Sequence, residues 1–342
     1  MVWRSVVINQ PAKLKREHFA LVIEQDSSAR VPFEDIAVIV LHHREITITH
    51  PVLSACAEYG IGLFSTGDNH QPNGIFLPYL AHSRATRMMR LQLAIDRPLA
   101  KRAWAGIVRA KISNQARCLK LTHSARVDDL ESLARRVRSG DPDNLEAQAS
   151  AIYFRAVFGA NFDRSQGVWT NAALDYGYSI FRGAIARGLV AHGFMPSIGL
   201  FHRSEQNAFN LADDVIEPFR PIVDLHVAKM RPADDAAQLS PSNKADLIAL
   251  LNIDVRTPRG VMAALSAIEH SVEALARLYE PAHAPQRPHA RARRAIPLGR
   301  RTATDDVLIN ATNSDSGDAE VDSASTLEWP ELIGLTPHRR EM

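Results

Sequence analysis

The sequence predicts an α+β fold: an N-terminal antiparallel β-sandwich-like domain followed by a larger, mostly α-helical domain. Two changes in pattern support this prediction. The first 65 residues alternate short β-branched runs with polar clusters, whereas residues 82–280 repeat apolar side chains every three or four positions. After residue 280 few apolar side chains remain. We therefore expect a β-domain over 1–78, a helical domain over 79–280 and a disordered tail over 281–342.

The N-terminal strands are predicted from β-branched segments bounded by turn-forming residues. A short helix at 51–60 and a loop at 65–74, rich in Gly, Pro, Asn and Asp, complete this part, and the loop is the expected linker between the domains. Strands that follow one another without intervening helices favour antiparallel sheets. The expected strands lie at 2–10, 18–25, 29–41, 45–50 and 61–66.

The helical domain is predicted from apolar positions at helical spacing, and Ser204 is the expected N-cap of one of its helices. Hydrophobic residues make up 46% of the chain, which suffices for one large or two modest cores. The expected helices lie at 83–96, 99–123, 128–138, 144–159, 170–192, 205–231, 241–252 and 258–279.

The predicted tail is defined by its charge blocks. Six Arg residues lie between positions 287 and 301, and the segment from there to Glu331 holds eight acids and no Lys or Arg. A basic block followed by an acidic one, with few core-forming residues, is typical of a disordered segment.

Composition and missing motifs exclude several classes of protein. No apolar stretch approaches the roughly 18 residues of a membrane helix, and no secretory signal begins the chain, so we expect a cytoplasmic protein without a membrane partner. Cys56 and Cys118 are the only cysteines, which excludes a disulfide scaffold. The chain lacks a phosphate loop, GxGxxG, GxSxG and HExxH. Chemistry, if the protein performs any, must therefore come from carboxylates, histidine and metal.

One region is strongly basic in an otherwise nearly neutral chain. Residues 84–138 hold 14 Lys and Arg against four acids. This excess favours a polyanion-binding face, although a solvated helix surface would give the same local pattern. The candidate residues for binding a polyanion such as a nucleic acid are Arg84, Arg87, Arg90, Lys101 and Arg102.

Acidic residues in two predicted helices form the candidate metal site. Asp213, Asp214 and Glu217 project from the polar face of helix 205–231, with His202 just before it. Carboxylates one turn apart can hold Mg²⁺ or Mn²⁺, and an imidazole nitrogen can complete the set. Glu146 lies in the first turn of helix 144–159. Ordinary explanations remain for each residue, because acids suit polar helix faces and helix N-termini.

Seven stretches, taken in order, carry a resemblance to a known family. They span residues 2–230 and read VWRSVVI, VPFEDIAVIVL, ITITHPVL, KISNQARCL, DNLEAQASAIYF, NAALDYGYSIFRGAIARGLVAHGFMPSIGLFH and NAFNLADDVIEPFRPIVD. The chain resembles the CRISPR-associated Cas-one family of adaptation endonuclease/integrases, most closely its type II branch. The tail after residue 280 has no counterpart in the family core.

The resemblance implies a site and a cofactor. The metal ligands and catalytic residues of the family fall on Glu146, His202 and Glu217, and the metal would be Mg²⁺ or Mn²⁺. The acidic position one turn earlier falls on Asp214, as a fourth ligand or a supporting residue; whether Asp213 or Asp214 approaches the metal stays open. Glu217 stands where many relatives outside the type II branch have Asp.

The resemblance also implies an activity and partners. The 3′-hydroxyl of a short DNA duplex, the prespacer, would attack a phosphodiester at the edge of a CRISPR repeat. A homodimer formed through the β-domain would act with the Cas-two protein, and with other type II CRISPR proteins. Two alternatives remain open: a metal-dependent nuclease on branched DNA without integration, and a non-catalytic DNA-binding scaffold.

Overall fold

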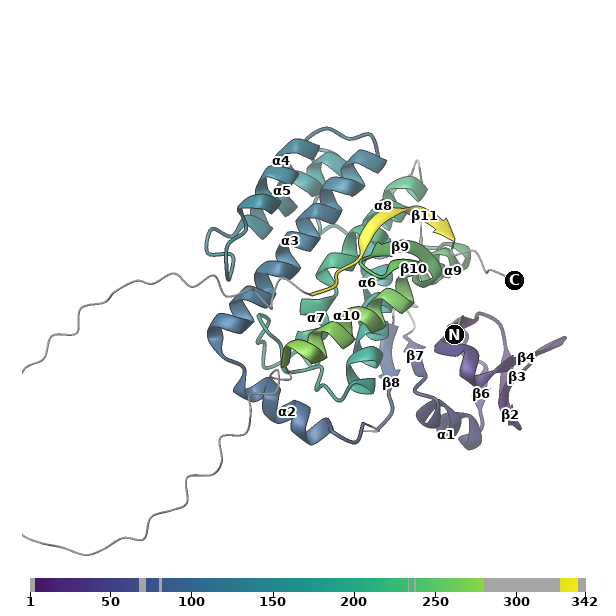
Figure 1. Ribbon diagram of the computed structural model, residues 1–342. Coiled ribbons are helices and arrows are strands. Elements are labelled where there is room, and N and C mark those ends of the chain that lie inside the picture. Colours follow the sequence, from purple (N-terminus) through teal and green to yellow (C-terminus); the bar gives the residue numbers. More distant parts are fainter. Residues whose placement is uncertain are drawn as a thin grey trace, which may run out of the picture.

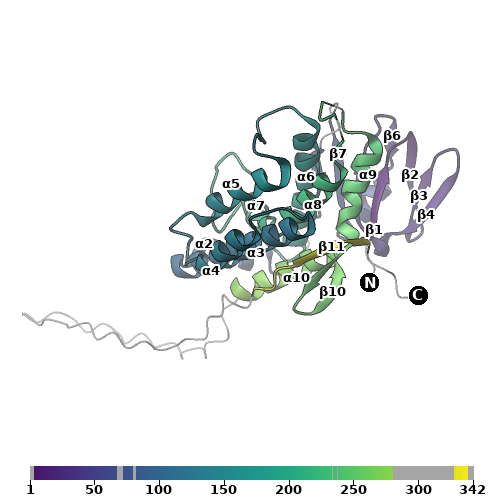
Figure 2. The same ribbon diagram turned by 90° about the horizontal axis from the view of Figure 1, so that it is seen from above.

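The fold is described by a computed structural model for residues 4–67, 72–79, 82–232, 234–236, 238–279 and 327–337. Its N-terminal part consists of two four-stranded sheets and helix α1 (His50–Glu58), and its larger part is helical (Figure 1). The predicted α+β class is therefore confirmed. The outer N-terminal sheet, formed by strands β4, β3, β2 and β6, lies at one end of the molecule (Figure 2). Helices α3 to α5, which span residues 97–158, lie at the other end.

The two N-terminal sheets share the apolar layer between them. One has the order β1-β5-β7-β8 and the other the order β4-β3-β2-β6. Leu14, Leu21, Phe33 and Ile39 are buried in this layer. The strands are β1 (Arg4–Ile8), β2 (Ala12–Glu17), β3 (Ala20–Glu24), β4 (Ser28–Pro32), β5 (Ile36–Leu41), β6 (Ile46–Ile48), β7 (Gly62–Thr66) and β8 (Pro72–Phe76).

The sheets are mixed, so the expectation of purely antiparallel strands was wrong. Strand β5 pairs in parallel with both β1 and β7, and β2 pairs in parallel with β6. The IAVIVL sequence of β5 is almost entirely buried, as is typical of a central parallel strand. Helix α1 supplies the crossover that a parallel β5–β7 pair requires. Strand β2 was not predicted, and β8 begins inside the predicted linker, of which residues 68–71 lie outside the described part.

Strand β5 also connects the N-terminal sheets to the helical core. Ile39 faces the layer between the sheets, whereas Val38 and Val40 pack into the core of the larger part. Strand β7 approaches helix α6 so closely that a Cβ at Gly183 would lie 1.9 Å from the ring of Phe64. A side chain at position 183 would therefore separate the sheet from the helix.

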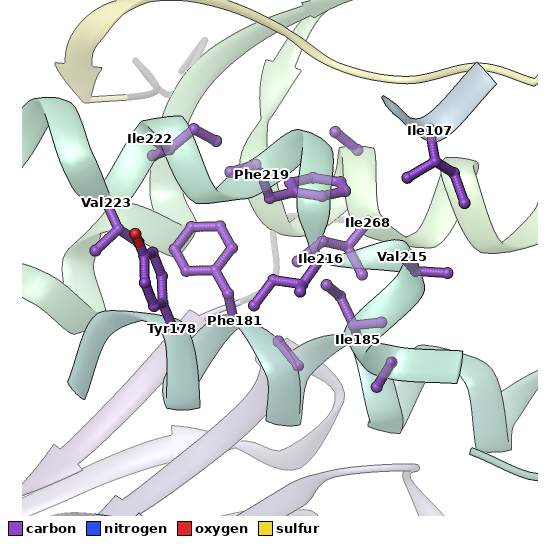
Figure 3. Close-up of a cluster of buried hydrophobic side chains, with 14 of the residues drawn as sticks. Ile107, Tyr178, Phe181, Ile185, Val215, Ile216, Phe219, Ile222, Val223 and Ile268 are labelled. Atoms are coloured by element: carbon purple, nitrogen blue, oxygen red, sulfur yellow. The ribbon is translucent and has the colours of Figure 1, made fainter. Parts of the chain in front are cut away.

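The larger part packs around the long helices α3 and α6. Figure 3 shows Phe181 and Ile185 of α6 meeting Phe219 and Ile222, with Ile107 of α3 at the side. The helices are α2 (Ala85–Ala94), α3 (Arg97–Leu121), α4 (Val127–Arg136), α5 (Leu145–Phe158), α6 (Trp169–Ala191), α7 (Asn210–Val215), α8 (Arg220–Met230), α9 (Pro241–Ala249) and α10 (Ala264–Tyr279). No helix among the described residues is both long and apolar enough to cross a bilayer.

Two of the predicted helices are interrupted. The helix expected over 205–231 is replaced by a loop, α7, the 3₁₀ turn η2 (Glu217–Phe219) and α8, so Ser204 is not an N-cap. Pro218 and Pro221 lack the backbone N–H that a continuous helix needs. Residues 258–263, expected to begin the helix 258–279, belong instead to the hairpin of β9 (Ile253–Thr257) and β10 (Gly260–Ala263).

Part of the predicted disordered tail is folded, which corrects the expectation for residues 327–337. Strand β11 (Glu331–Pro337) pairs with β9 and lies beside α3 and α8 (Figure 1). Leu332 is 3% exposed, and Asn114 of α3 accepts from Leu332 N–H at 3.1 Å. The Asn114 amide also donates at 2.8 Å to the carbonyls of Pro330 and Pro218. Sequence could not show this pairing, because a seven-residue strand gains its apolar burial only against the folded core. Residues 280–326 and 338–342 lie outside the described part.

Removing the chain from Leu327 onward should lower the melting temperature. The truncation exposes the edge of β9 and leaves the buried Asn114 amide without two of its partners. Leu332→Ala alone should cost about 2–5 kcal/mol of unfolding free energy, which lowers the melting temperature by about 3–7 °C. Differential scanning calorimetry measures both effects. A chain ending after Pro337 is the control and should melt as the full chain does; an unchanged melting temperature in the truncation before Leu327 would show that the strand contributes nothing.

Candidate active site

Two predicted site residues meet at a lysine that the sequence analysis did not single out. Lys111 of α3 places its Nζ 2.7 Å from Glu146 Oε1 of α5 and 2.5 Å from Glu217 Oε2 of η2. Lys111 is 8% and Glu217 is 4% exposed, whereas Glu146 is half-buried. Three separate elements thus bring one ammonium and two carboxylates together at the edge of the core.

The charges in this cluster hold one another ionised. Burial alone would raise the pKa of Glu217, but Arg220 and Lys111 outweigh it and lower that pKa to about 2. Burial alone would lower the pKa of Lys111, but the two carboxylates raise it above its ordinary value. Removing the Lys111 ammonium would leave the two carboxylates without their shared countercharge, which is destabilising, whereas removing one carboxylate leaves Lys111 paired with the other.

Arg220 connects Glu217 to a second buried acid. Its Nε donates to Glu217 Oε1 at 2.8 Å, and its guanidinium lies 4.5 Å from the ring centre of Tyr178. The Tyr178 hydroxyl donates to Asp224, which also accepts from Tyr153 at 2.9 Å. Burial raises the pKa of Asp224 to about 6, against the lowering effect of these hydrogen bonds. Arg220 therefore cannot move away from Glu217 without leaving the Tyr178 ring.

Asp214 holds the loop that carries His202. The carboxylate is fully buried and accepts from the N–H groups of Leu200 at 2.6 Å, Phe201 at 3.1 Å and His202 at 3.1 Å. Its Oδ1 also lies 2.7 Å from His202 Nδ1. This hydrogen bond is the main cause of the raised pKa of His202, and the Glu217 charge adds to it. With Nδ1 engaged, Nε2 is the ring nitrogen left for a ligand.

The same loop is fixed one turn earlier in α7. The Asn210 amide donates to the carbonyls of Ser197, Ser204 and Asn207. A Cβ at Gly199 would lie 2.3 Å from the His202 carbonyl oxygen and 2.9 Å from Asp214 Oδ2. The loop can therefore close over Asp214 only with glycine at position 199.

The two adjacent aspartates of α7, between which the sequence could not choose, have different partners in the structure. Asp214 faces His202, whereas Asp213 pairs with Arg182 of α6 at 2.9 Å and accepts from the Asn207 amide at 2.6 Å. Asp213 thus belongs to a different contact, in which Arg182 also covers the ring of Phe209.

Glu146 is positioned by a cap that the sequence analysis missed. Asp141 accepts from the N–H groups of Leu145 at 2.9 Å and Glu146 at 3.0 Å, which satisfies two free donors at the start of α5. A carboxylate before the first turn of a helix could have indicated this cap. Lys111 could have been found as a lysine on the apolar face of α3, between Ile107 and Ile112.

Glu146, His202 and Glu217 are the side chains that would bind the expected divalent cation. Within the described part of the chain, no three His, Cys, Asp or Glu side chains already stand as a metal cage. The Lys111 ammonium nevertheless shows that a positive charge is accommodated between Glu146 and Glu217. Glu217 Oε2 is buried, and its partner is the Lys111 ammonium, whose place between the carboxylates a cation would have to share or take. Two charged carboxylates and an imidazole oriented by a carboxylate suit Mg²⁺ or Mn²⁺.

The candidate DNA-binding residues lie on two successive helices. Arg84 precedes α2, and Arg87 and Arg90 follow it at three-residue spacing; all three are exposed. On α3, Lys101 is exposed and Arg102 is half-buried. Their role in binding DNA stays a prediction.

Comparison with known proteins shows the family. Residues 5–236 match the family model described as CRISPR associated protein Cas1. The CRISPR-associated endonuclease Cas1 of Neisseria meningitidis serogroup C (strain 8013) is 44% identical over 275 residues, which cover 80% of this chain and 90% of that protein.

Solved structures show the same fold. A casposase bound to integration product has a TM-score of 0.64 at 17% identity, covering 82% of this chain and 90% of that one. A Cas1 protein from Thermotoga maritima has a TM-score of 0.59 at 18% identity, covering 81% and 97%. A chain of a Cas6-RT-Cas1–Cas2 complex has a TM-score of 0.61 at 17% identity, covering 81% of this chain and 35% of that one. Since the family model matches more than half of the chain and the Neisseria relative is similar over most of its length, this chain belongs to the CRISPR-associated Cas1 family.

Proposed function

We propose that this protein is a divalent-metal-dependent DNA endonuclease and integrase that inserts short duplexes into a CRISPR array. The observation that carries the proposal is the convergence of Glu146 and Glu217, from different elements, on one buried positive charge beside His202. The endonuclease name of the Neisseria relative and the integration product held by the casposase support it.

Glu146, His202 and Glu217 would hold Mg²⁺ or Mn²⁺. The ion, when bound, would stabilise the negative charge that develops on the phosphoryl oxygens during attack by the 3′-hydroxyl. Lys111 and Arg220 keep Glu217 ionised and oriented, and Asp214 keeps the His202 ring in place. Asp214 would be a supporting residue, since its oxygens already serve the loop backbone and the His202 ring.

The partners are part of the proposal. Prespacers vary in sequence, so contacts from Arg84, Arg87, Arg90, Lys101 and Arg102 would go to phosphates. The chain would form a homodimer through residues 1–75 and act with a Cas2 protein, as the name of the Cas1–Cas2 assembly suggests. Glu217, in a position where many relatives have Asp, supports a place in the type II branch.

Strand joining distinguishes this proposal from a nuclease that only cuts branched DNA. The protein is incubated with a Cas2 partner, a labelled duplex and a supercoiled repeat-bearing plasmid, with Mn²⁺ or with EDTA. Label joined to the plasmid only in Mn²⁺ supports the integrase. Cutting without joining supports the nuclease. If neither reaction occurs, only the DNA-binding scaffold remains.

Glu217→Gln should reduce joining and cleavage to background. The change keeps the size of the side chain but removes the charge that would hold the cation, while DNA affinity stays similar. Gel assays of joining and anisotropy measurements of binding check the two effects. The matched control is Glu205→Gln, at an exposed position of the neighbouring loop, which should retain full joining. Near-normal joining by Glu217→Gln in Mn²⁺ would show that Glu217 is not a metal ligand.

The two aspartates of α7 should differ in their effects. Asp214→Asn keeps the shape of the side chain but weakens its bonds to the loop and to His202, so joining should fall about 10- to 100-fold. Asp213→Asn is the matched control and should have a smaller effect, because Asp213 contacts Arg182 instead. Joining rates at saturating DNA measure both. A larger loss in Asp213→Asn would contradict the assignment.

Arg87→Ala should change binding rather than chemistry. If Arg87 neutralises one phosphate, the slope of log affinity against log salt should fall by about 0.9. Joining at saturating DNA should survive. Arg30→Ala, on the outer N-terminal sheet, is the control and should leave the slope unchanged. Identical slopes for wild type and Arg87→Ala would remove Arg87 from the DNA interface.

A further inference from the structure

A buried glutamine connects helix α2 to the loop that carries His202. Gln92 lies in the last turn of α2 and is 2% exposed. Its Nε2 donates to the carbonyls of Met195 and Ile198, at 3.1 Å each, and its Oε1 accepts from Met195 N–H at 2.9 Å. Both N–H groups of the side-chain amide are thus used. None of these three hydrogen bonds involves a residue of the proposed metal site.

The hydrogen bonds of Gln92 enclose one turn of the loop. Ile198 N–H donates to the Met195 carbonyl at 3.1 Å, so the glutamine amide contacts both ends of the turn formed by residues 195–198. Burying an amide is costly unless its polar atoms are paired, and here three hydrogen bonds offset that cost. Because all the partners are backbone atoms of one turn, Gln92 fixes the position of this turn relative to α2.

The same turn is bonded to α7 on its other side. Leu211 N–H donates to the carbonyl of Pro196 at 2.7 Å, and the Asn210 amide donates to the next carbonyl along the chain at 3.1 Å. Further along the loop, Asp214 holds the His202 ring. These contacts all come from one helix of six residues. The amide on α2 therefore supplies an anchor from a different helix, and the loop is held between the two.

A glycine at the start of the loop brings the loop and α2 close together. Gly193 has a φ of +82°, and a Cβ there would lie 2.7 Å from His82 Nδ1 and 3.2 Å from Ala85 Cα, where α2 begins. The chain can therefore pass α2 at this distance only with glycine. Contact between the loop and α2 thus extends from Gly193 to Ile198.

The opposite face of α2 carries candidate phosphate contacts. Arg87 and Arg90 are exposed. Met88 and Gln92, four residues apart, are buried on the other side of the helix. One helix thus presents cations outward and holds the His202 loop on its inner side. A DNA strand bound to the outer face would lie at a fixed distance from the histidine, because the helix and the loop cannot shift independently.

We propose that Gln92 is a positioning residue for His202, which keeps α2 and the metal site in a fixed relation. This role rests on the proposed function, because the relation matters for the reaction only if DNA bound to α2 reaches Glu146 and Glu217. At 2% exposure, Gln92 itself contacts neither DNA nor the cation. Its loss should therefore lower the rate of joining once DNA is bound, without changing how tightly the DNA binds.

The test uses Gln92→Met, which keeps nearly the same side-chain length but forms none of the three hydrogen bonds. At saturating DNA, this variant should join about 10- to 100-fold more slowly than wild type, and Mn²⁺ titrated into the full chain without DNA should bind at least about tenfold more weakly. The DNA concentration that gives half-maximal joining should stay unchanged.

Two further variants separate positioning from stability. Met88→Ala, one turn earlier on the same buried face, is the matched control: its melting temperature should fall, but its joining rate and Mn²⁺ affinity should match those of wild type. Gln92→Asn keeps an amide but is one methylene shorter, so it cannot reach both ends of the turn. It should show the same loss of rate with unchanged DNA affinity, and it serves if Gln92→Met does not fold.

Four other outcomes have defined meanings. Wild-type joining and Mn²⁺ affinity in folded Gln92→Met would overturn the positioning role. Equal losses of rate in Gln92→Met and Met88→Ala, with Mn²⁺ affinity retained, would show a packing effect of α2 and also overturn it. A rise in the half-maximal DNA concentration alone would overturn it in favour of a role in DNA binding. Weaker Mn²⁺ binding by Gln92→Met, with no joining by wild type, would support the positioning role and reject the integrase function.

Discussion

The buried ammonium of Lys111, placed between Glu146 and Glu217, is the constraint on which the rest of the site depends. Glu217 of η2 stays ionised in the core because Arg220 and Lys111 compensate its burial, and Glu146 of α5 pairs with the same Lys111 ammonium. Helix α3 therefore fixes the separation of the other two elements. One turn further along, Asn114 bonds the carbonyl of Pro218, next to Glu217, and the C-terminal strand β11. The strand thus supports the turn that carries Glu217.

A second set of contacts brings the histidine to this cluster. Asn210 and Asp214 lie one turn apart on α7 and form hydrogen bonds with the backbone of the preceding loop. Gly199 lets that loop approach Asp214 closely. Phe201 and His202 leave the loop in a fixed orientation because Asp214 holds both of their N–H groups. Asp213 is one residue away but serves Arg182. Two neighbouring aspartates of the short helix α7 thus have different partners, and only Asp214 orients the His202 ring.

Sequence patterns predicted what depends on local periodicity. The α+β class and the positions of α3, α5 and α6 follow from apolar spacing. The choice of Glu146 and His202 as site residues follows from the family resemblance. Parallel pairing of β5, the breaks at Pro218 and Pro221, and the docking of β11 on β9 depend on contacts between distant segments. The roles of Lys111 and Asp141 were missed for the same reason, since each is defined by partners on another element. Periodicity also could not separate Asp213 from Asp214, because they differ only in their partners, Arg182 and His202, which lie on other segments.

The most direct test of the account is the binding of Mn²⁺ itself, without DNA or turnover. Isothermal titration calorimetry at neutral pH should find one ion per chain in the wild-type protein, and Glu146→Gln and Glu217→Gln should each weaken it at least about tenfold. Glu205→Gln, the exposed control, should bind as wild type does. If both variants of the carboxylate cluster bind Mn²⁺ with wild-type affinity, the convergence on Lys111 is only a structural ion pair, and the cation site must lie elsewhere.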